Sequence, residues 1–171
     1  MLALTIPKEV KVTSGKNFIC VEGPLGVLIK ESSKVKFIIK NVQIYCVAGD
    51  DFKLKQTYTS ILRNLIFGVT KGYRKKLRLV GVGFRAWIKD SNLLLKIGYS
   101  HEVLYSIPKD IQIVCSKNKG VILVVSGIEQ ARVNQVAIEI KRLRMPDIYK
   151  GKGIHYNKEI IKLKKGKREG K

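Results

Sequence analysis

The sequence predicts an α+β protein of two similar tandem domains, each a small antiparallel β-sheet with one packed α-helix, and a basic C-terminal tail. Two observations predict the repeat. The stretch IPKEVKVT at 6–13 returns as IPKDIQIV at 107–114, and both copies run through a polar turn into a β-rich segment. Each copy is also accompanied by short β-branched runs and one longer amphipathic segment. A duplicated unit of about 80–90 residues accounts for both observations.

The first domain, residues 1–79, is expected to consist of short strands followed by a helix. Its β-branched and aromatic runs are separated by turn residues such as GPLG, a pattern typical of strands. The runs are VKVT at 10–13, FICVE at 18–22, VLIKE at 27–31, VKFIIK at 35–40 and QIYCVA at 43–48. The helix is expected over 56–71, where apolar residues recur on one face, and Gly72 suits its end.

The second domain, residues 80–171, repeats this order. Its strands are expected at 77–89, 93–97, 102–107, 111–115 and 121–126. A helix should follow over 128–144, because apolar residues recur there with helical spacing. Ser126-Gly-Ile-Glu129 has the spacing of a capping box for this helix, and Pro146 should end it.

The junction between the domains carries its own signal. Apolar residues occupy odd positions from Leu77 to Leu79 and even positions from Val80 to Ile88. Because side chains alternate strictly along a strand, burying both sets requires an extra residue or a break. Gly81 and Gly83 suit such a bulge or close backbone approach. We therefore place the domain boundary near residue 79.

The charge balance points to a polyanionic partner. Lys and Arg number 34 against 13 Asp and Glu, which gives a net charge of +21. A surface this positive repels itself unless a polyanion neutralises it, so nucleic acid is the first expectation. A polybasic protein at an anionic membrane surface is an alternative, but no apolar run approaches the roughly 18 residues of a membrane span. The start of the chain resembles neither a signal peptide nor a transit peptide.

The usual motifs of enzymes and metal sites are missing. The phosphate-binding pattern G-x-x-x-x-G-K-[ST] is absent, and the two histidines, His101 and His155, lack metal-ligand spacing. Ser100-His101-Glu102 contains triad residue types, but neighbours in sequence seldom meet in triad geometry. The sequence therefore predicts no catalytic residue, metal or cofactor, with a basic RNA-processing or nucleotide-using enzyme as the alternative. The cysteines, Cys20, Cys46 and Cys115, are expected as buried thiols in a reducing compartment.

The basic residues gather in two stretches. Residues 71–89 carry seven Lys or Arg and no acid, with aromatic residues interleaved; this pattern suits either nucleic acid or a solvated face. Residues 141–171 carry twelve Lys or Arg against three acids. The tail at 157–171 repels itself, so we expect it to condense onto phosphates, where counterion release supplies free energy. Its candidate contacts are Lys162, Lys164, Lys165, Lys167 and Arg168.

The loop in MPDIYKGKGIHY at 145–156 is the sharpest candidate site. Its two glycines allow positive φ and close backbone approach, so that amide groups can point at phosphate oxygens. Lys150 and Lys152 add charge, and Tyr149 and Tyr156 offer stacking or sugar contacts. A nucleotide pocket would need a helix N-terminus behind the glycines, whereas here a helix ends before them. An extended polyanion fits this loop better than a single nucleotide.

Several segments resemble the universal family of large-subunit ribosomal protein six. PDIYKGKGI at 146–154 is similar to the signature of its bacterial and organellar members. GVTKGYRKKLRLVGVGFRA at 68–86, IGYSHEV at 97–103 and VNQVAIEIKRLRMPDIYKGKGIHY at 133–156 follow the family pattern in order. His155 stands where the family usually has arginine.

The resemblance implies a structural, non-catalytic protein that binds large-subunit rRNA, mostly through the second domain. The implied location is near the sarcin–ricin loop and the stalk base, among neighbouring large-subunit proteins, where elongation factors dock. Carried over by position, the RNA-contacting residues are Tyr149, Lys150, Gly151, Lys152, Gly153, His155 and Tyr156. No membrane partner is expected. The Ile- and Lys-rich, Ala-poor composition favours a mitochondrion, with a bacterial cytoplasm as the alternative.

Overall fold

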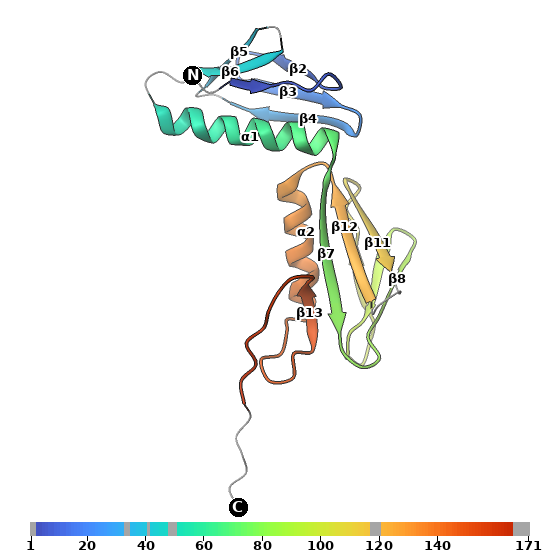
Figure 1. Ribbon diagram of the computed structural model, residues 1–171. Helices are drawn as coiled ribbons and strands as arrows, with labels where there is room; N and C mark the ends of the chain where they lie inside the picture. Colours follow the sequence, from blue (N-terminus) through green and yellow to red (C-terminus); the bar gives the residue numbers. More distant parts are fainter. Residues whose placement is uncertain (1–2, 33–34, 41, 48–50, 117–120, 166–171) are drawn as a thin grey trace, which may run out of the picture. The chain divides into compact units, whose positions relative to one another are not determined.

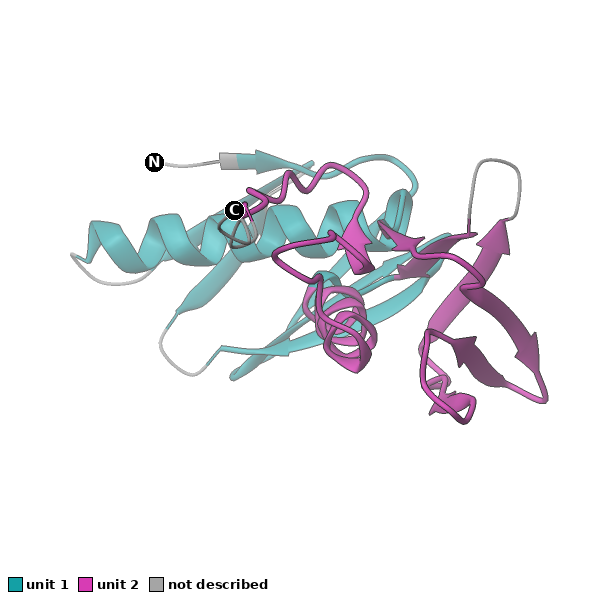
Figure 2. Cartoon of the chain, turned by 90° about the horizontal axis from the view of Figure 1, so that it is seen from below, with its two compact units in different colours: residues 1–73, 128–130 teal, residues 74–127, 131–171 magenta. Residues whose placement is uncertain are grey.

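The computed structural model describes residues 3–32, 35–40, 42–47, 51–116 and 121–165. It confirms the α+β class. The chain forms two compact units (Figure 2). Unit 1 comprises residues 1–73 and 128–130, and unit 2 comprises residues 74–127 and 131–171. The sequence placed the boundary near residue 79, whereas the compact units part after Tyr73.

Unit 1 contains two three-stranded antiparallel sheets and the helix α1 (Phe52–Thr70) (Figure 1). One sheet has the order β2-β3-β4, and the other has the order β1-β6-β5. The strands are β1 (Ala3–Thr5), β2 (Lys11–Ser14), β3 (Phe18–Gly23), β4 (Gly26–Glu31), β5 (Lys36–Lys40) and β6 (Gln43–Val47). Five of them match the runs expected from the sequence, whereas β1 was not expected. The helix begins four residues before its predicted start.

The core of unit 1 forms where alternate residues of the strands meet the apolar face of the helix. Alternate residues of β3, Ile19 and Val21, are buried against α1, which contributes Leu62 and Val69 to the same cluster. Ile44 of β6 joins them from the second sheet. One face of α1 therefore covers parts of both sheets, and the unit has one apolar core.

Unit 2 has a four-stranded sheet, a three-stranded antiparallel sheet and the helix α2 (Gln130–Leu143). The four-stranded sheet has the order β11-β12-β7-β13, and the other has the order β10-β9-β8. The strands are β7 (Tyr73–Val80), β8 (Arg85–Lys89), β9 (Asn92–Lys96), β10 (Val103–Ser106), β11 (Ile111–Ser116), β12 (Val121–Gly127) and β13 (Gly153–Tyr156). Figure 1 shows α2 lying along the sheet that contains β7 and β12.

Unit 2 contains the predicted break but not the predicted capping box. The break expected at the face switch is present, because β7 ends at Val80 and β8 begins at Arg85. The predicted capping box is wrong. Ser126 lies in β12, where its hydroxyl donates to the Gln112 carbonyl at 3.1 Å, and α2 begins only at Gln130. A capping serine would instead accept a backbone N–H of the first helical turn, so the Ser126 hydroxyl joins β12 to β11 and does not cap α2.

The described residues contain neither a cluster of metal ligands nor a membrane-spanning helix. No three His, Cys, Asp or Glu side chains among them gather as a metal ion requires. In the same part of the chain, no helix has the length and apolarity needed to cross a bilayer. The three cysteines, Cys20, Cys46 and Cys115, are half-buried, whereas the sequence predicted buried thiols.

Candidate nucleic-acid interface

One end of unit 2 brings three separate segments together. The strand β13 pairs antiparallel with β7, and Gly153 lies opposite Val80. The chain entering β13 and the chain leaving β7 therefore lie at the same end of the sheet. The ring of Phe84 would meet a Cβ placed on Gly98 at 3.3 Å, which brings in a third segment. We call this region the basic end and define it as residues 81–84, 97–102 and 144–152.

The carboxylate of Asp147 organises residues 147–152, which we call the lysine loop. Its oxygens accept the backbone N–H groups of Tyr149 at 3.3 Å and Lys150 at 3.0 Å. Two backbone hydrogen bonds close the loop further. The Gly151 N–H donates to the Asp147 carbonyl at 3.0 Å, and the Asp147 N–H donates to the Lys152 carbonyl at 2.8 Å. The bonds from the Tyr149 and Lys150 N–H groups favour the ionised carboxylate, so the pKa of Asp147 lies below its ordinary value. The loop is held by its own backbone.

Two glycines are required for this loop. Gly151 has φ +65° and Gly153 has φ +146°, conformations that side chains rarely adopt. A Cβ on Gly153 would lie 2.7 Å from the Met145 carbonyl oxygen and 2.7 Å from the Pro146 Cα. Since both of these atoms belong to the backbone, neither can move aside cheaply. Gly153 thus fixes how the chain enters β13.

The loop holds its cations outward. Tyr149, Lys150 and Lys152 are all exposed, and Tyr149 retains 60% of its surface. Neither ammonium group forms a salt bridge with any described residue. Unpaired cations on an ordered backbone suit a ligand that brings its own negative charge.

His155 lies in a different environment from the rest of the predicted site. Its side chain is 5% exposed, and Nε2 lies 2.8 Å from the Gly151 carbonyl oxygen. Burial leaves the ring almost no surface for RNA, so the geometry favours a role in holding the loop. The sequence placed it in a loop, whereas it belongs to β13, a strand that was not expected.

Tyr156 is half-buried between two lysines. The Lys75 ammonium lies 5.0 Å from the ring centroid and the Lys141 ammonium lies 4.7 Å from it, which are cation–π distances. Glu159 then holds the chain after β13, because one of its oxygens is 2.6 Å from Lys141 Nζ and the other accepts Tyr156 N–H at 3.0 Å. The Lys141 bond, followed by the backbone bond, lowers the pKa of Glu159.

The first part of the tail is therefore attached to the body of unit 2. Asn157 N–H donates to the Lys76 carbonyl at 3.0 Å, and Lys164 N–H donates to the Ile148 carbonyl at 3.1 Å. The second bond ties the tail to the lysine loop. Of the predicted tail contacts, Lys162, Lys164 and Lys165 are exposed, while Lys167 and Arg168 lie outside the described residues.

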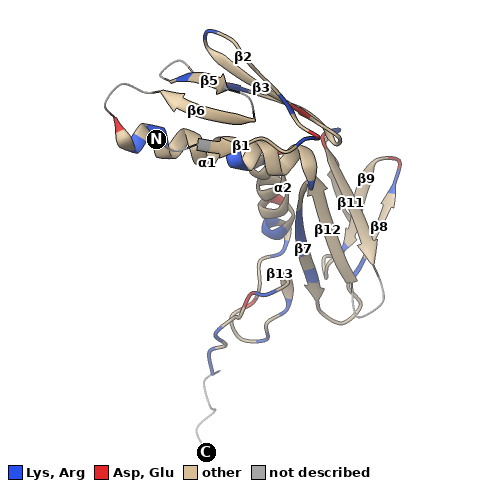
Figure 3. Cartoon of the chain, turned by 45° about the horizontal axis from the view of Figure 1, so that its top comes forward, with Lys and Arg blue, Asp and Glu red and all other residues tan. Residues whose placement is uncertain are grey.

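A further row of cations lies on β7. Figure 3 shows Lys and Arg along β7. Arg74, Lys76 and Arg78 are exposed and alternate with Leu77 and Leu79, which are buried. Because alternate residues share a face, the three cations form a stripe on the outer face of the sheet. The sequence showed this basic stretch but did not separate the exposed cations from Lys75, which faces Tyr156.

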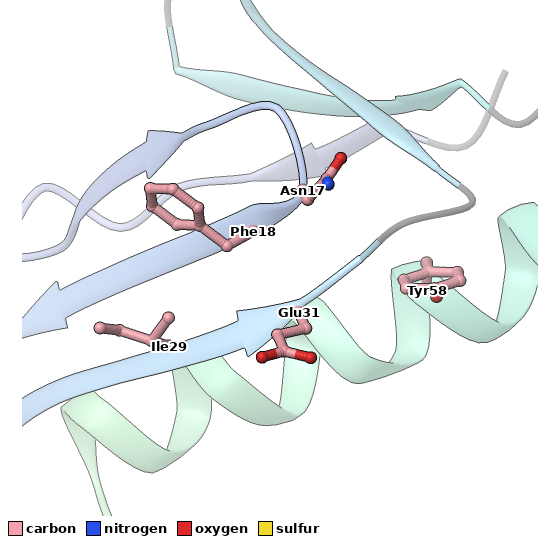
Figure 4. Close-up of a pocket in the computed structure, with 5 residues that line it drawn as sticks. All are labelled: Asn17, Phe18, Ile29, Glu31 and Tyr58. Carbon is pink, nitrogen blue, oxygen red and sulfur yellow. The ribbon is translucent and has the colours of Figure 1, made fainter.

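A hollow in unit 1 has a different chemistry. It measures 810 Å³ and is lined by Asn17, Phe18, Ile29, Glu31 and Tyr58 (Figure 4). With one acid and no base among these residues, it offers nothing to a phosphate. The residues Ser100, His101 and Glu102 form no triad either; the His101 ring is stacked with Tyr99 at a centroid distance of 6.2 Å.

Comparison with known proteins gives consistent matches. The model of the family "Ribosomal protein L6" matches residues 80–157, a span that includes the whole basic end. Large ribosomal subunit protein uL6 of Mycoplasmoides gallisepticum is 44% identical over 98% of this chain and 95% of the relative. Large ribosomal subunit protein uL6m of Reclinomonas americana is 41% identical over 97% and 96%. Large ribosomal subunit protein uL6 of Thermotoga maritima is 36% identical over 96% and 95%.

Proposed function

Because the chain belongs to the ribosomal protein L6 family, we propose that it is a structural component of the large ribosomal subunit that binds large-subunit rRNA. The lysine loop, the tail and the β7 stripe supply the contacts, and the folded sheet of unit 2 holds them in place. The protein acts by binding and carries out no reaction. Within the subunit, we place the contact near the sarcin–ricin loop and stalk base, beside neighbouring proteins and the docking region of elongation factors.

One observation carries this proposal: hydrogen bonds hold the backbone of the lysine loop, yet its two ammonium groups form no salt bridge with any residue that the structure describes. Lys150 and Lys152 are exposed on a backbone that Asp147 and two positive-φ glycines fix. A solvated surface turn needs no such fixing. Phosphates are spaced along RNA at set positions, so a rigid loop can match them without first losing conformational freedom.

The mode of binding is recognition of RNA shape and backbone. Lysines act as point charges towards phosphates and do not identify bases. The lysines of the loop and the tail are all of this kind. A-form RNA presents its phosphates and 2′-hydroxyls across a shallow minor groove, where such a surface can bind. For the compartment we propose a mitochondrion, with a bacterial cytoplasm as the alternative, since the relatives include both bacterial uL6 and a uL6m protein.

The experiment measures the affinity of the full chain for protein-free large-subunit rRNA as a function of salt. If about four to eight phosphates are neutralised, log K should fall with log salt with a slope of several units. Changing both Lys150 and Lys152 to alanine should reduce that slope by between one and two units, since each contact contributes about 0.7–0.9. A flat salt response, or an unchanged slope in the double variant, overturns the proposal.

A further inference from the structure

We propose that Tyr99, His101 and Arg144 form a second RNA contact at the basic end, where the His101 ring stacks on an unpaired base of the rRNA. This inference rests on the proposed function and adds to it a contact with a base. The lysine loop and tail bind phosphates, whereas this cluster provides the planar surface that a base requires.

The cluster is built on the same framework as the lysine loop. The Tyr99 hydroxyl donates to the Leu143 carbonyl at 3.0 Å, which ties the segment 97–102 to the end of α2. The next residue, Arg144, accepts the Ile154 N–H at 2.9 Å through its carbonyl, and this bond joins the same point to β13. The segment 97–102 and the strand β13 are therefore tied to two consecutive residues, Leu143 and Arg144, and the lysine loop connects Arg144 to β13.

The rings are ordered although they lie on the surface. The Arg144 guanidinium lies 4.8 Å from the centroid of the Tyr99 ring, and the Tyr99 and His101 planes are within 15° of parallel. Tyr99 is thus held by its hydroxyl and by a cation on its ring. It nevertheless remains 41% exposed, and His101 is exposed as well. A tyrosine that only satisfied the end of α2 would not require an exposed ring stacked beside it.

The charges around the cluster favour RNA over a protein surface. Arg85 and Lys96 lie directly opposite each other on β8 and β9, and both side chains are exposed. Like charges in opposite positions destabilise a sheet, and a nearby anion removes that repulsion. Since Lys96 directly precedes the segment 97–102, the same polyanion can reach both. Aromatic rings among cations are the usual surface for stacked bases of single-stranded RNA.

The test compares three full-length chains on protein-free large-subunit rRNA: the natural chain, His101→Ala and His101→Phe. Alanine should weaken binding by about fivefold to tenfold, the lower part of the range for one stacked base. Phenylalanine should restore binding, because it keeps a planar ring. The slope of log K against log salt should be the same in all three chains, since no phosphate contact is lost.

Chemical probing of the bases gives the second readout. The natural chain should protect one or a few unpaired bases that His101→Ala exposes, while the sugar–backbone footprint of both chains stays the same. Full affinity and unchanged base protection in His101→Ala overturn the inference and leave the proposed function intact. A natural chain that fails to bind the rRNA overturns both. Loss of affinity in His101→Phe as large as in alanine also contradicts stacking.

Discussion

The two units share an order of elements but use their surfaces in opposite ways. Unit 1 exposes apolar residues on its β2-β3-β4 sheet, with Phe18 at 44%, Val27 at 51% and Ile29 at 66% exposure. Unit 2 exposes cations at one end and along β7. Its helix is followed by a closed loop and an additional strand, β13, whereas α1 continues into β7 through Lys71 and Gly72. The difference teaches that the segment after α2, which has no counterpart in unit 1, carries most of the proposed RNA contacts, and that the β7 stripe adds to them.

The largest effect should come from Gly153→Ala in unit 2. A Cβ there overlaps the backbone at Met145 and Pro146 at a φ of +146°, so the lysine loop must be displaced. We expect a loss of rRNA affinity greater than about tenfold, from strain of roughly 1–3 kcal/mol together with the displaced lysines. Filter binding or fluorescence anisotropy would measure the loss.

The matched control is Gly26→Ala in unit 1. Its φ is +145°, and the added Cβ meets only the end of the Ile128 side chain, at 2.8 Å. This variant should lower the thermal stability of the protein and leave RNA affinity nearly unchanged. Equal losses of affinity in the two variants would show that strain anywhere in the chain weakens binding, which removes the distinction between the units.

Removing two lysines should have the next largest effect. Lys150→Ala with Lys152→Ala in unit 2 should weaken binding by about tenfold at moderate salt, because two phosphate contacts are lost. The matched pair in unit 1, Lys8→Ala with Lys36→Ala, removes the same charge from exposed positions. It should change affinity by less than about twofold. If the two pairs weaken binding alike, net charge alone attracts the RNA and the placement of the lysines has no role.

Glu159→Ala should have a smaller effect, and it should weaken rRNA binding although it removes a negative charge. Removing an acid near a polyanion ordinarily strengthens binding, but Glu159 holds the tail through Lys141 and the Tyr156 N–H. We expect roughly threefold weaker binding, because the tail lysines lose their fixed position. In unit 1, Glu31→Ala removes an exposed acid and should leave affinity unchanged or slightly higher. Stronger binding by Glu159→Ala would show that the attachment of the tail contributes nothing.

The smallest expected effect is a loss of local stability around Asp147 and Glu159 at acidic pH. Hydrogen bonds lower the pKa values of Asp147 and Glu159 from ordinary values of 3.8 and 4.5. Their contribution to stability is therefore fully present above those ordinary values and is lost as the pH falls through the lowered pKa values. Hydrogen-exchange protection of the Lys150 and Tyr156 amides should decrease in that acidic range. Ser32 N–H in unit 1, which donates to the Asn17 carbonyl, should keep its protection.

Much of the fold could be predicted from sequence because its elements are marked locally. The repeated IPK segments, the apolar stripes of the two helices and the break at Gly81 all depend on neighbours in the chain. The strand β13 could not be predicted in this way. It consists of four residues, and its partners on β7 lie more than 70 residues earlier. Pairing with β7, and not local propensity, makes Gly153–Tyr156 a strand.

Only those parts of the candidate site that are marked by neighbouring residues in the sequence could be predicted. The glycines and lysines of the loop were visible because they follow one another in sequence. The burial of His155 was not, because it results from the pairing of β13 with β7 and from the contact of the ring Nε2 with the Gly151 carbonyl. The stack of Tyr99 beside Arg144 joins residues 45 positions apart, and only the folded chain brings them together.

Lysine reactivity in the assembled subunit tests the central claim most directly. Amine acetylation read by mass spectrometry would compare the free protein with the protein in large ribosomal subunits and with the protein on protein-free rRNA. We predict that Lys150, Lys152 and Lys162 become protected in both complexes, while Lys8 and Lys36 of unit 1 stay reactive on the rRNA. If Lys150 and Lys152 are acetylated equally in the free and the RNA-bound protein, the lysine loop does not lie against RNA, and the account is wrong.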